Sequence, residues 1–463
     1  MSKKYLQLII LFLLITGFIT SCKVIQPYRA PQVRTEGLYR DSTTTDTNTI
    51  ASLHWNEIFT DTILQSLITE GIAQNLDLKI AYTRIEQARA YYEQSRLAFF
   101  PSLNANASGT LSRLSDAQSA GRASSAQQYQ LGLTSSWEAN IWGQLSSTRR
   151  ANLATLLQNE AASRAVQTSL IANIANYYYS LLALDQQLAI TQQTVQYWDT
   201  TVVTMRALKE ADVVTGAAVV QSEASRYAAA VTIPDIRQDI RQTENALSIL
   251  LARPSGAIRR STLDDERPIE VLQTGIPAQL LANRPDVQEA EYNFRYYFEL
   301  TNVARTYFYP ALTITASGGL SSLTLGNFFN GGSIFGNLVG GLAQPIFSQG
   351  INRARLRSAQ AQQQQALFNF QNVLLTAGRE VSDALSSYQT ALDKAGVRSN
   401  QLSALQQSVA FSQELLRYGF ANYTEVLTAR QSLLGAQLSS VNDRLQQLQA
   451  IVNLYNALGG GWK

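Results

Sequence analysis

The chain is built from two similar halves, and each half carries a pair of short alternating segments between long helical ones. Superimposing Pro101 on Pro310 aligns the two halves. The same shift superimposes five further pairs of identical residues, Asp77 with Asp286, Ala81 with Ala290, Leu103 with Leu312, Ala107 with Ala316 and Gly109 with Gly318. Each half reads helix, two strands, long helix, helix, so the fold has to repeat one structural unit twice.

The long segments have the periodicity of helices that pack along a seam. Apolar residues recur in steps of three or four at Leu367, Phe370, Leu374, Ala377, Val381, Leu385, Tyr388 and Leu392. The first half has a similar stripe, and no proline occurs between Pro101 and Pro234. A helix of about sixty residues extends roughly 90 Å, which is longer than a globular domain needs. We predict long helices paired as coiled coils.

The shorter segments have the alternation of strands with one apolar and one polar face. They cover residues of about 102–111 and 129–138 in the first half, and of about 311–320 and 336–346 in the second. Four strands are too few to close a water-filled barrel, because even small barrels need about eight. Three copies of the chain supply twelve, so we predict a barrel shared by a homotrimer. A soluble sandwich is the alternative, but it leaves the long helices unexplained.

The first 21 residues have the features of a bacterial lipoprotein signal peptide. Lys3 and Lys4 precede an apolar run over residues 6–18, and Ile19-Thr20-Ser21-Cys22 resembles a lipobox. We expect cleavage before Cys22 and covalent diacylglycerol and fatty acyl groups on this residue, which anchor it in lipid. The following Lys23, in place of an aspartate, fits transfer to the outer membrane. The alternative is an incidental or buried cysteine.

Composition excludes several classes of function. The chain is 45% hydrophobic and 15% charged, with a formal net charge of only +3, so it is an ordered protein without a nucleic-acid footprint. His54 is the only histidine and Cys22 the only cysteine, which excludes a histidine-based triad, a disulfide within the chain and a multi-histidine or thiolate metal site. We predict that the chain is not an enzyme and has no metal or other cofactor. Asp264, Asp265 and Glu266 are interpreted as solvated residues of a polar linker.

Several motifs together resemble the TolC-like outer-membrane efflux proteins, in the NodT/OprM-like lipoprotein branch that serves resistance–nodulation–division (RND) pumps. The motifs extend over nearly the whole mature chain: Asn75-Leu76-Asp77-Leu78, Trp137-Glu138-Ala139-Asn140-Ile141-Trp142-Gly143, Ile276-Pro277-Ala278-Gln279-Leu280-Leu281, Arg284-Pro285-Asp286-Val287, Pro345-Ile346-Phe347-Ser348-Gln349-Gly350 and Leu454-Tyr455-Asn456-Ala457-Leu458-Gly459-Gly460-Gly461-Trp462. The resemblance implies a mainly α-helical protomer with a membrane β-barrel, forming a homotrimeric twelve-stranded barrel continued by a periplasmic coiled-coil tunnel.

The resemblance also implies a function and partners. It identifies a passive exit duct of a tripartite efflux system for drugs or other small toxic compounds. The duct lies in the outer membrane, in contact with outer-membrane lipid, and works with a periplasmic adaptor protein and an inner-membrane RND transporter. Two alternatives stay open: a TolC-like duct for type I protein secretion, and a lipid-anchored coiled-coil scaffold without a pore.

These features predict a sequence of segments along the chain. The order is signal peptide 1–21, lipidated extension 22–60, first repeat 61–253, linker 254–276, second repeat 277–458 and C-terminal tail 459–463. Within this scheme Pro285 and Asp286 fit the first turn of a helix. Trp137, Trp142 and Phe347 mark the ends of strands, where we favour packing over a role as interfacial aromatics.

The turns between the paired long helices are the candidate functional sites. The second-half turn spans residues 416–427 and the first-half turn 209–216, and in the resembled family such turns meet the adaptor and close the channel. The gate and tip candidates are Glu425, Arg417, Gly419 and Thr428, and the adaptor-contact candidates are Lys209, Thr215, Gly216 and Tyr418. Glu425 matches one acidic gate position of the family, whereas Thr428 occupies the other. The alternative role for Glu425 is a helix-start glutamate stabilised by the helix dipole.

Overall fold

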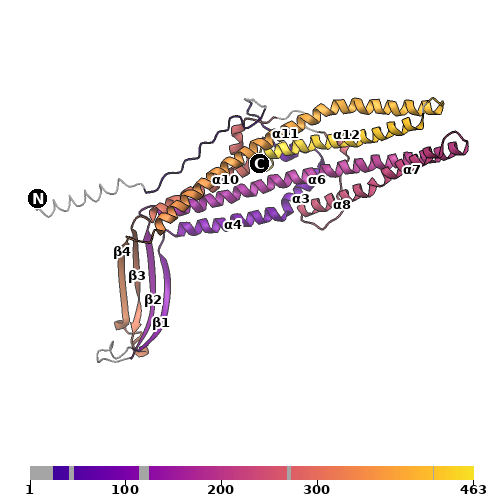
Figure 1. Ribbon diagram of the computed structural model, residues 1–463. Coiled ribbons are helices and arrows are strands. Elements are labelled where there is room, and N and C mark those ends of the chain that lie inside the picture. Colours follow the sequence, from indigo (N-terminus) through magenta and orange to yellow (C-terminus); the bar gives the residue numbers. More distant parts are fainter. Residues whose placement is uncertain (1–23, 41–45, 114–124, 268–272, 421) are drawn as a thin grey trace. The chain divides into compact units, whose positions relative to one another are not determined.

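The computed structural model describes residues 24–40, 46–113, 125–267, 273–420 and 422–463 (Figure 1). The chain divides into two compact units, which are described separately. The first comprises the described residues within Met1–Gln32, Arg84–Asn159 and Ala290–Phe370, and the second those within Val33–Thr83, Glu160–Glu289 and Gln371–Lys463. Over the described residues the fold is mainly helical with four strands, as predicted. Cys22 and the predicted signal peptide lie outside the described residues, so lipidation stays a prediction.

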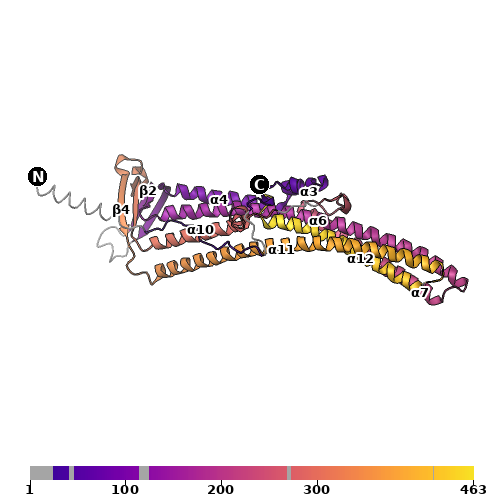
Figure 2. The same cartoon turned by 90° about the horizontal axis from the view of Figure 1, so that it is seen from above.

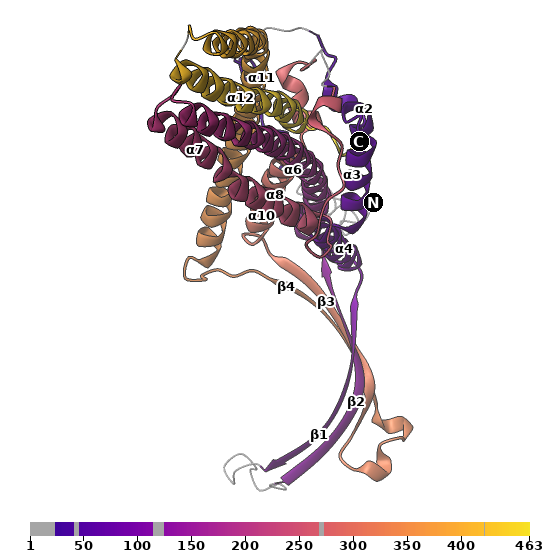
Figure 3. The ribbon, with the colours of Figure 1, turned by 90° about the vertical axis from the view of Figure 1, so that its right-hand side faces the viewer.

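The first unit contains an antiparallel sheet of four strands in chain order, β1(Ser102–Arg113), β2(Ser125–Ala139), β3(Ala311–Ser322) and β4(Ile334–Ala343). Figure 3 shows the strands side by side and curving together. Ala107 is paired with Leu131 and Leu131 with Leu320, so the apolar residues of neighbouring strands share one face. Many of them are exposed, including Leu111 at 75% and Leu338 at 73%. The sheet therefore presents an apolar face that the protomer leaves uncovered.

Glycines allow β2 and β3 to approach closely in the middle of this sheet. A Cβ on Gly319 would lie 2.1 Å from the carbonyl oxygen of Leu131 and 2.5 Å from the Cα of Gly132. Only a residue without a side chain fits where two backbones come this near. On the same sheet, the ring of Phe335 occupies the space beside Gly132, 3.3 Å from where a Cβ would be.

Short-range contacts fix the passage from strands to helices in the first unit. Trp137 donates its indole N–H to the carbonyl of Phe99 at 2.9 Å, and Trp142 donates to the carbonyl of Pro310 at 2.7 Å. These two tryptophans pack as predicted. Phe347 does not, because its side chain is 86% exposed in the turn that follows β4. The packing interpretation was therefore wrong for Phe347.

The N-terminal segment of the first unit is held in place by specific contacts with α10(Pro285–Thr306). The backbone of Gln26 exchanges two hydrogen bonds with the side-chain amide of Asn302, at 3.0 and 2.9 Å. Tyr28 packs edge-on against Phe298 with ring centroids 5.5 Å apart. The segment that follows the predicted lipidation site is therefore part of the folded unit.

The helices of the second unit include the long parts of two helices of 67 residues each, α6(Gln144–Glu210) and α11(Ile351–Arg417). The others, in chain order, are α2(Trp55–Ile58), α3(Thr62–Gln74), α4(Leu76–Leu97), α7(Gly216–Ala230), α8(Thr232–Leu250), α9(Leu280–Asn283) and α12(Tyr423–Ala457), and α4 extends into the first unit. Short 3-10 turns lie at Ile50–Ser52, Leu263–Asp265 and Pro277–Gln279 in this unit and at Leu325–Asn327 and Gly331–Ser333 in the first.

The core of the second unit lies where α3 meets the middle of α6. Ile68, Ile174 and Leu182 are almost completely buried, and a Cβ on Gly71 would lie 2.4 Å from the Cδ1 of Ile174. Gly71 therefore allows the two helices to approach closely. The same unit contains the C-terminus, where α12 ends at Ala457 and Trp462 donates to the carbonyl of Asn283 at 3.0 Å.

The halves are similar, with two departures from the predicted pattern. The last helix of the second half, α12, is continuous, whereas its first-half counterpart divides into α7 and α8 around Val231. Pro234 lies in the first turn of α8, where it lacks the amide donor that a continuous helix needs. Two strands begin earlier than predicted, β2 at Ser125 and β4 at Ile334, and β4 also ends earlier, at Ala343. Across the described ranges, no helix has the length and apolar content needed to cross a membrane.

Candidate functional site

Two turns between helices of the second unit form the candidate site (Figure 2). The first has the predicted bounds, whereas the second is shorter than the predicted range 416–427, because α12 already begins at Tyr423. The first connects the end of α6 at Glu210 to the start of α7 at Gly216, and the second connects the end of α11 at Arg417 to the start of α12 at Tyr423. Gly419 has a φ of +77°, a conformation that favours glycine. The chain reverses direction between α11 and α12 because Gly419 leaves the helical conformation.

A cavity of about 800 Å³ lies between the two turns. Met205 and Leu208 of α6, Leu416 of α11 and Tyr423 of α12 contribute to its wall. Met205 and Tyr423 also belong to a buried cluster with Trp198, Val219, Ala229 and Leu427, which draws on α6, α7 and α12. We call this end of the second unit, where the two turns lie, the tip. The helical pairs α6/α7 and α11/α12 pack together there, and the cavity lies at the end of this assembly.

Polar contacts join the two helical pairs beneath this cavity. Ser222 of α7 donates a 2.8 Å hydrogen bond to the buried hydroxyl of Tyr423, and burial raises the pKa of Tyr423. Gln413 of α11 donates to the hydroxyl of Tyr197 on α6 at 2.7 Å. The guanidinium of Arg430 on α12 lies 3.7 Å from the centre of the Tyr197 ring, a cation–π contact.

Two ion pairs join α6 and α7 near this end of the second unit. Arg206 of α6 pairs with Glu223 of α7 at 2.5 Å, and Asp199 of α6 pairs with Arg226 of α7. The Asp199 contact raises the pKa of Arg226. These groups are substantially exposed, so their ion pairs contribute little to stability.

Glu425 occupies the first turn of α12 and is exposed. Its backbone N–H donates to the carbonyl of Asn422 at 3.0 Å, and Asn422 caps the helix through Thr424 at 3.1 Å. Thr428 is also exposed, and its hydroxyl donates to the carbonyl of Thr424 at 2.9 Å. Both side chains are accessible from outside the protomer, and the helix dipole favours the charge of Glu425.

The structure brings some of the predicted site residues together and separates others. Thr215, Arg417 and Gly419 line the same cavity, although they come from the two different turns. The Cε of Lys209 lies 3.9 Å from where a Cβ on Gly216 would be, so these two are neighbours at the end of α6. The other predicted residues, Tyr418, Glu425 and Thr428, are exposed and do not line the cavity.

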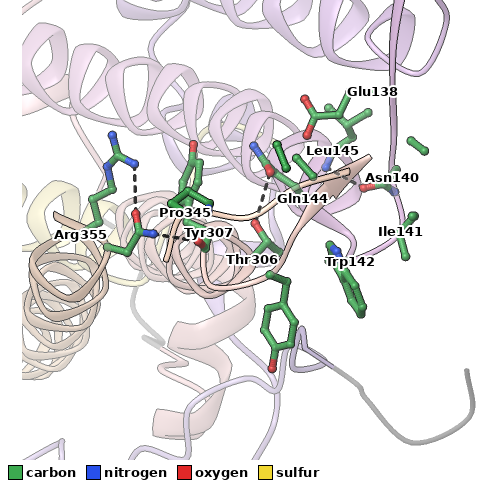
Figure 4. Close-up of a pocket in the computed structure, with 15 residues that line it drawn as sticks. Glu138, Asn140, Ile141, Trp142, Gln144, Leu145, Thr306, Tyr307, Pro345 and Arg355 are labelled. Atoms are coloured by element: carbon green, nitrogen blue, oxygen red, sulfur yellow. Dashed lines mark hydrogen bonds between the residues drawn. The ribbon is translucent and has the colours of Figure 1, made fainter. Parts of the chain in front are cut away.

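A second cavity, of about 370 Å³, lies in the first unit where strands pass into helices (Figure 4). Asn352 donates to the carbonyl of Tyr307 at 2.9 Å and accepts from Arg355 at 3.4 Å along its wall. Thr306 and Gln144 contact each other at 3.4 Å on the other side. Among the described residues, no cluster of three or more His, Cys, Asp or Glu side chains is placed to bind a metal ion.

Both halves of the chain match one protein family. A sequence profile described as "Outer membrane efflux protein" matches residues 67–253 and again residues 276–460. The chain belongs to the outer membrane efflux protein family. This membership confirms the family and the outer-membrane location that the motifs predicted.

Individual relatives agree with this assignment over nearly their full length. The chain is 29% identical to the antibiotic efflux pump outer membrane protein ArpC of Pseudomonas putida, over 98% of the chain and 96% of ArpC. It is 28% identical to the cation efflux system protein CusC of Escherichia coli, over 96% of the chain and 97% of CusC. The open state of the MtrE outer membrane channel of Neisseria gonorrhoeae superimposes with a TM-score of 0.86 at 25% identity, covering 96% of this chain and 99% of MtrE.

For this efflux protein, sequence reasoning missed the residues that join the helical pairs at the tip. Tyr197, Ser222, Gln413 and Arg430 connect different helices there. The apolar stripe through Trp198 and Met205 indicated a packing seam, but it did not show which polar side chains meet across it. Such pairings depend on how helices far apart in the sequence are placed.

Proposed function

We propose that the protein is the outer-membrane exit duct of a tripartite RND-type efflux system, and not an enzyme. The observation that carries this proposal is the sheet of four strands with an exposed apolar face and unpaired outer edges on β1 and β4. Such a sheet is completed when three copies pair edge to edge into a twelve-stranded barrel. The homotrimer and its barrel in outer-membrane lipid belong to this proposal.

The remaining parts of the system follow from the same proposal. An inner-membrane transporter supplies the energy, a periplasmic adaptor contacts the helical turns, and this chain conducts drugs or other small toxic compounds passively. Lys209, Thr215, Gly216 and Tyr418 are the proposed adaptor contacts, and their exposure or position at the cavity supports that role. ArpC and CusC are named for different cargoes, antibiotics and cations, and are almost equally similar to this chain. The cargo class therefore stays general.

We further propose that Cys22 is the lipidated N-terminal residue of the mature protein, with no other cofactor. The segment after it supports this, because Gln26 and Tyr28 are fixed against α10. Mass spectrometry of the N-terminal peptide from purified protein tests the proposal. A peptide that begins at Cys22 and carries diacylglycerol and fatty acyl groups is expected, whereas an unmodified Cys22 would contradict it.

The duct is tested by the mass of the purified, acylated protein in detergent together with its conductance in planar bilayers. A trimer that carries a small, stable current is expected. A monomer without current would instead favour a scaffold without a pore. A conducting trimer that associates with an ABC-type exporter, and with no RND transporter, would favour type I protein secretion.

Glu425 is the proposed gate residue, because a trimer brings three copies of this exposed carboxylate to the tip. In Glu425→Gln we expect cation selectivity to fall several-fold, since the three charges that attract cations are lost. The reversal potential in a salt gradient across a planar bilayer measures this. Glu414→Gln is the matched control, an exposed glutamate before the turn on α11. Equal selectivity in wild type and Glu425→Gln would leave Glu425 only its role at the helix start.

A further inference from the structure

The linker between the two repeats is fastened to the helices of the second unit by buried groups. Ile258 and Leu263 are buried at 4% and 3% exposure. Between them, Arg260 pairs with Asp185 of α6 at 2.5 Å and with Glu244 of α8 at 2.6 Å. These two carboxylates hold the guanidinium charged, and the Asp185 hydrogen bond raises the pKa of Arg260. Arg260 is therefore charged at any ordinary pH.

A second set of contacts holds the linker at Asp61, the residue that precedes α3. One carboxylate oxygen accepts from the backbone N–H of Ile63 at 2.7 Å. The other accepts from the hydroxyl of Ser261 in the linker at 2.6 Å and from the hydroxyl of Tyr178 on α6. Burial alone opposes ionisation, but the hydrogen bonds from Ser261 and Tyr178 outweigh it and lower the pKa of Asp61. Asp61 is therefore the ionised acid of this cluster.

Glu266 lies in the same cluster, and its carboxyl group makes no ion pair with the described residues, although the charge of Arg444 acts on it and slightly offsets the effect of burial. Its exposure is only 5%, which corrects the expectation that all three linker acids are solvated. Its nearest hydroxyl donor among the described residues is Ser261, at 3.5 Å, and Ser261 lies closer to Asp61. Arg444 of α12 donates at 2.5 Å to the backbone carbonyl of Glu266, and its other bond goes to Gln447. Burial, followed by the contact with Asp61, raises the pKa of Glu266 to about 7.

The other titratable groups around Glu266 do not neutralise it. Tyr178 and Tyr179 of α6 stay neutral, because burial raises the pKa of both hydroxyls. Arg267 of the linker lines the small cavity beside Glu266 but is exposed, and the ion pairs among the described residues include none to Glu266. Asp264 and Asp265 are exposed to solvent. A buried carboxyl group beside an ionised one tends to keep its proton, because a second negative charge in the same site is costly.

We propose that protonated Glu266 and ionised Asp61, which meet at the hydroxyl of Ser261, form a pH-sensitive clasp that holds the inter-repeat linker against α6 and α12 at acidic pH and loosens it as the pH rises to neutrality. Loss of the proton places a second charge in a buried site beside Asp61. Opening of the linker then becomes more favourable, because it exposes the charged carboxylate of Glu266 to water. This inference concerns the second unit alone and does not rest on transport.

The direction of the pH dependence follows from the two acids. Glu266 binds its proton more tightly in the closed linker, so its contribution to closure is fully present below about pH 4.5 and is lost as the pH rises through about 7. Asp61 has a lowered pKa, so its contribution is present above its ordinary pKa and is lost only in stronger acid. The clasp is therefore tightest near pH 4, between the ordinary pKa of 3.8 for Asp61 and that of 4.5 for Glu266, and it weakens steadily from there to about pH 7.

Hydrogen exchange of backbone amides in residues 258–266 of the full-length protein tests the clasp. After correction for intrinsic exchange rates, the opening constant of wild type is expected to rise on the order of tenfold between pH 5.5 and 7.5. Glu266→Gln mimics the protonated acid and should show no such rise. Asp264→Asn is the matched control, since it removes a neighbouring exposed charge and should behave as wild type.

Two results would overturn the proposal. One is a flat corrected profile in wild type, which needs no variant to be informative. The other is an equal rise in wild type and Glu266→Gln. If Glu266→Gln does not fold, infrared difference spectra of wild type between pH 6 and 8 supply the second readout. Loss of a protonated carboxyl band supports the clasp, and absence of any such band contradicts it.

Discussion

Replacing Arg284 by alanine is expected to destabilise the second unit by about 2–4 kcal/mol. Arg284 is 7% exposed and donates to Asp286 at 2.6 Å, to Glu380 at 2.7 Å and to the carbonyl of Ala457 at 2.9 Å. The substitution removes the cation that connects the start of α10 with α11 and the end of α12. It leaves two carboxylates, each 38% exposed, without their partner. Thermal or denaturant unfolding of the purified protein measures the loss.

Arg379 provides the matched control for this prediction. It pairs with Asp383 one helical turn away at 2.8 Å, and both side chains are 64% exposed. Arg379→Ala should therefore leave the unfolding midpoint almost unchanged. Arg284→Lys should fall between wild type and Arg284→Ala, because lysine keeps the charge but loses the two-pronged contact with Asp286. Equal midpoints for Arg284→Ala and Arg379→Ala would show that the Arg284 cluster adds no stability.

Gly319→Ala is expected to disrupt the sheet, at a cost of about 3 kcal/mol or more. The new Cβ would lie 2.1 Å from the carbonyl oxygen of Leu131 and 2.5 Å from the Cα of Gly132. Both atoms belong to the backbone of β2, which cannot move away without losing its pairing with β3. The yield of folded, protease-resistant protein in the outer membrane measures this effect.

Gly340→Ala is the control for the sheet. Gly340 lies on β4 opposite Ile314, and a Cβ there meets no atom within 4 Å. Its yield should match wild type, because alanine adds a methyl group into open space. A normal yield of Gly319→Ala would mean that β2 and β3 adjust their separation, and a loss of yield in both variants would point to a general need for glycine in these strands.

The tip of the second unit explains how the two helical pairs are held together. Each turn by itself ends one pair, but the contacts of Tyr197 with Gln413 and Arg430 and of Ser222 with Tyr423 cross between pairs. The cavity at the end of this assembly includes Thr215 and Arg417, one from each turn. A partner that contacts the tip therefore meets residues of both repeats.

The sequence by itself determined the order of elements, the lengths of the long helices, the positions of the strands and the turns at the tip. These features depend on neighbours along the chain: strand alternation repeats every two residues, helical packing every three or four, and helices stop where residues such as Gly419 leave helical conformation. Pro285 at the start of α10 belongs to the same group.

The tertiary structure decided which polar groups meet and which are buried. Glu266 belongs to a polar stretch of the sequence, yet it is buried. Its neighbour Ser261 contacts Asp61, which lies 200 residues earlier in the sequence. The partners of Arg284 on α11 and α12 and the close approach of Gly319 to Leu131 likewise join distant parts of the chain. Local patterns determine which face of a helix or strand is apolar. Burial of a particular charge and its pKa depend on which distant atoms surround it, and only the folded chain brings those atoms together.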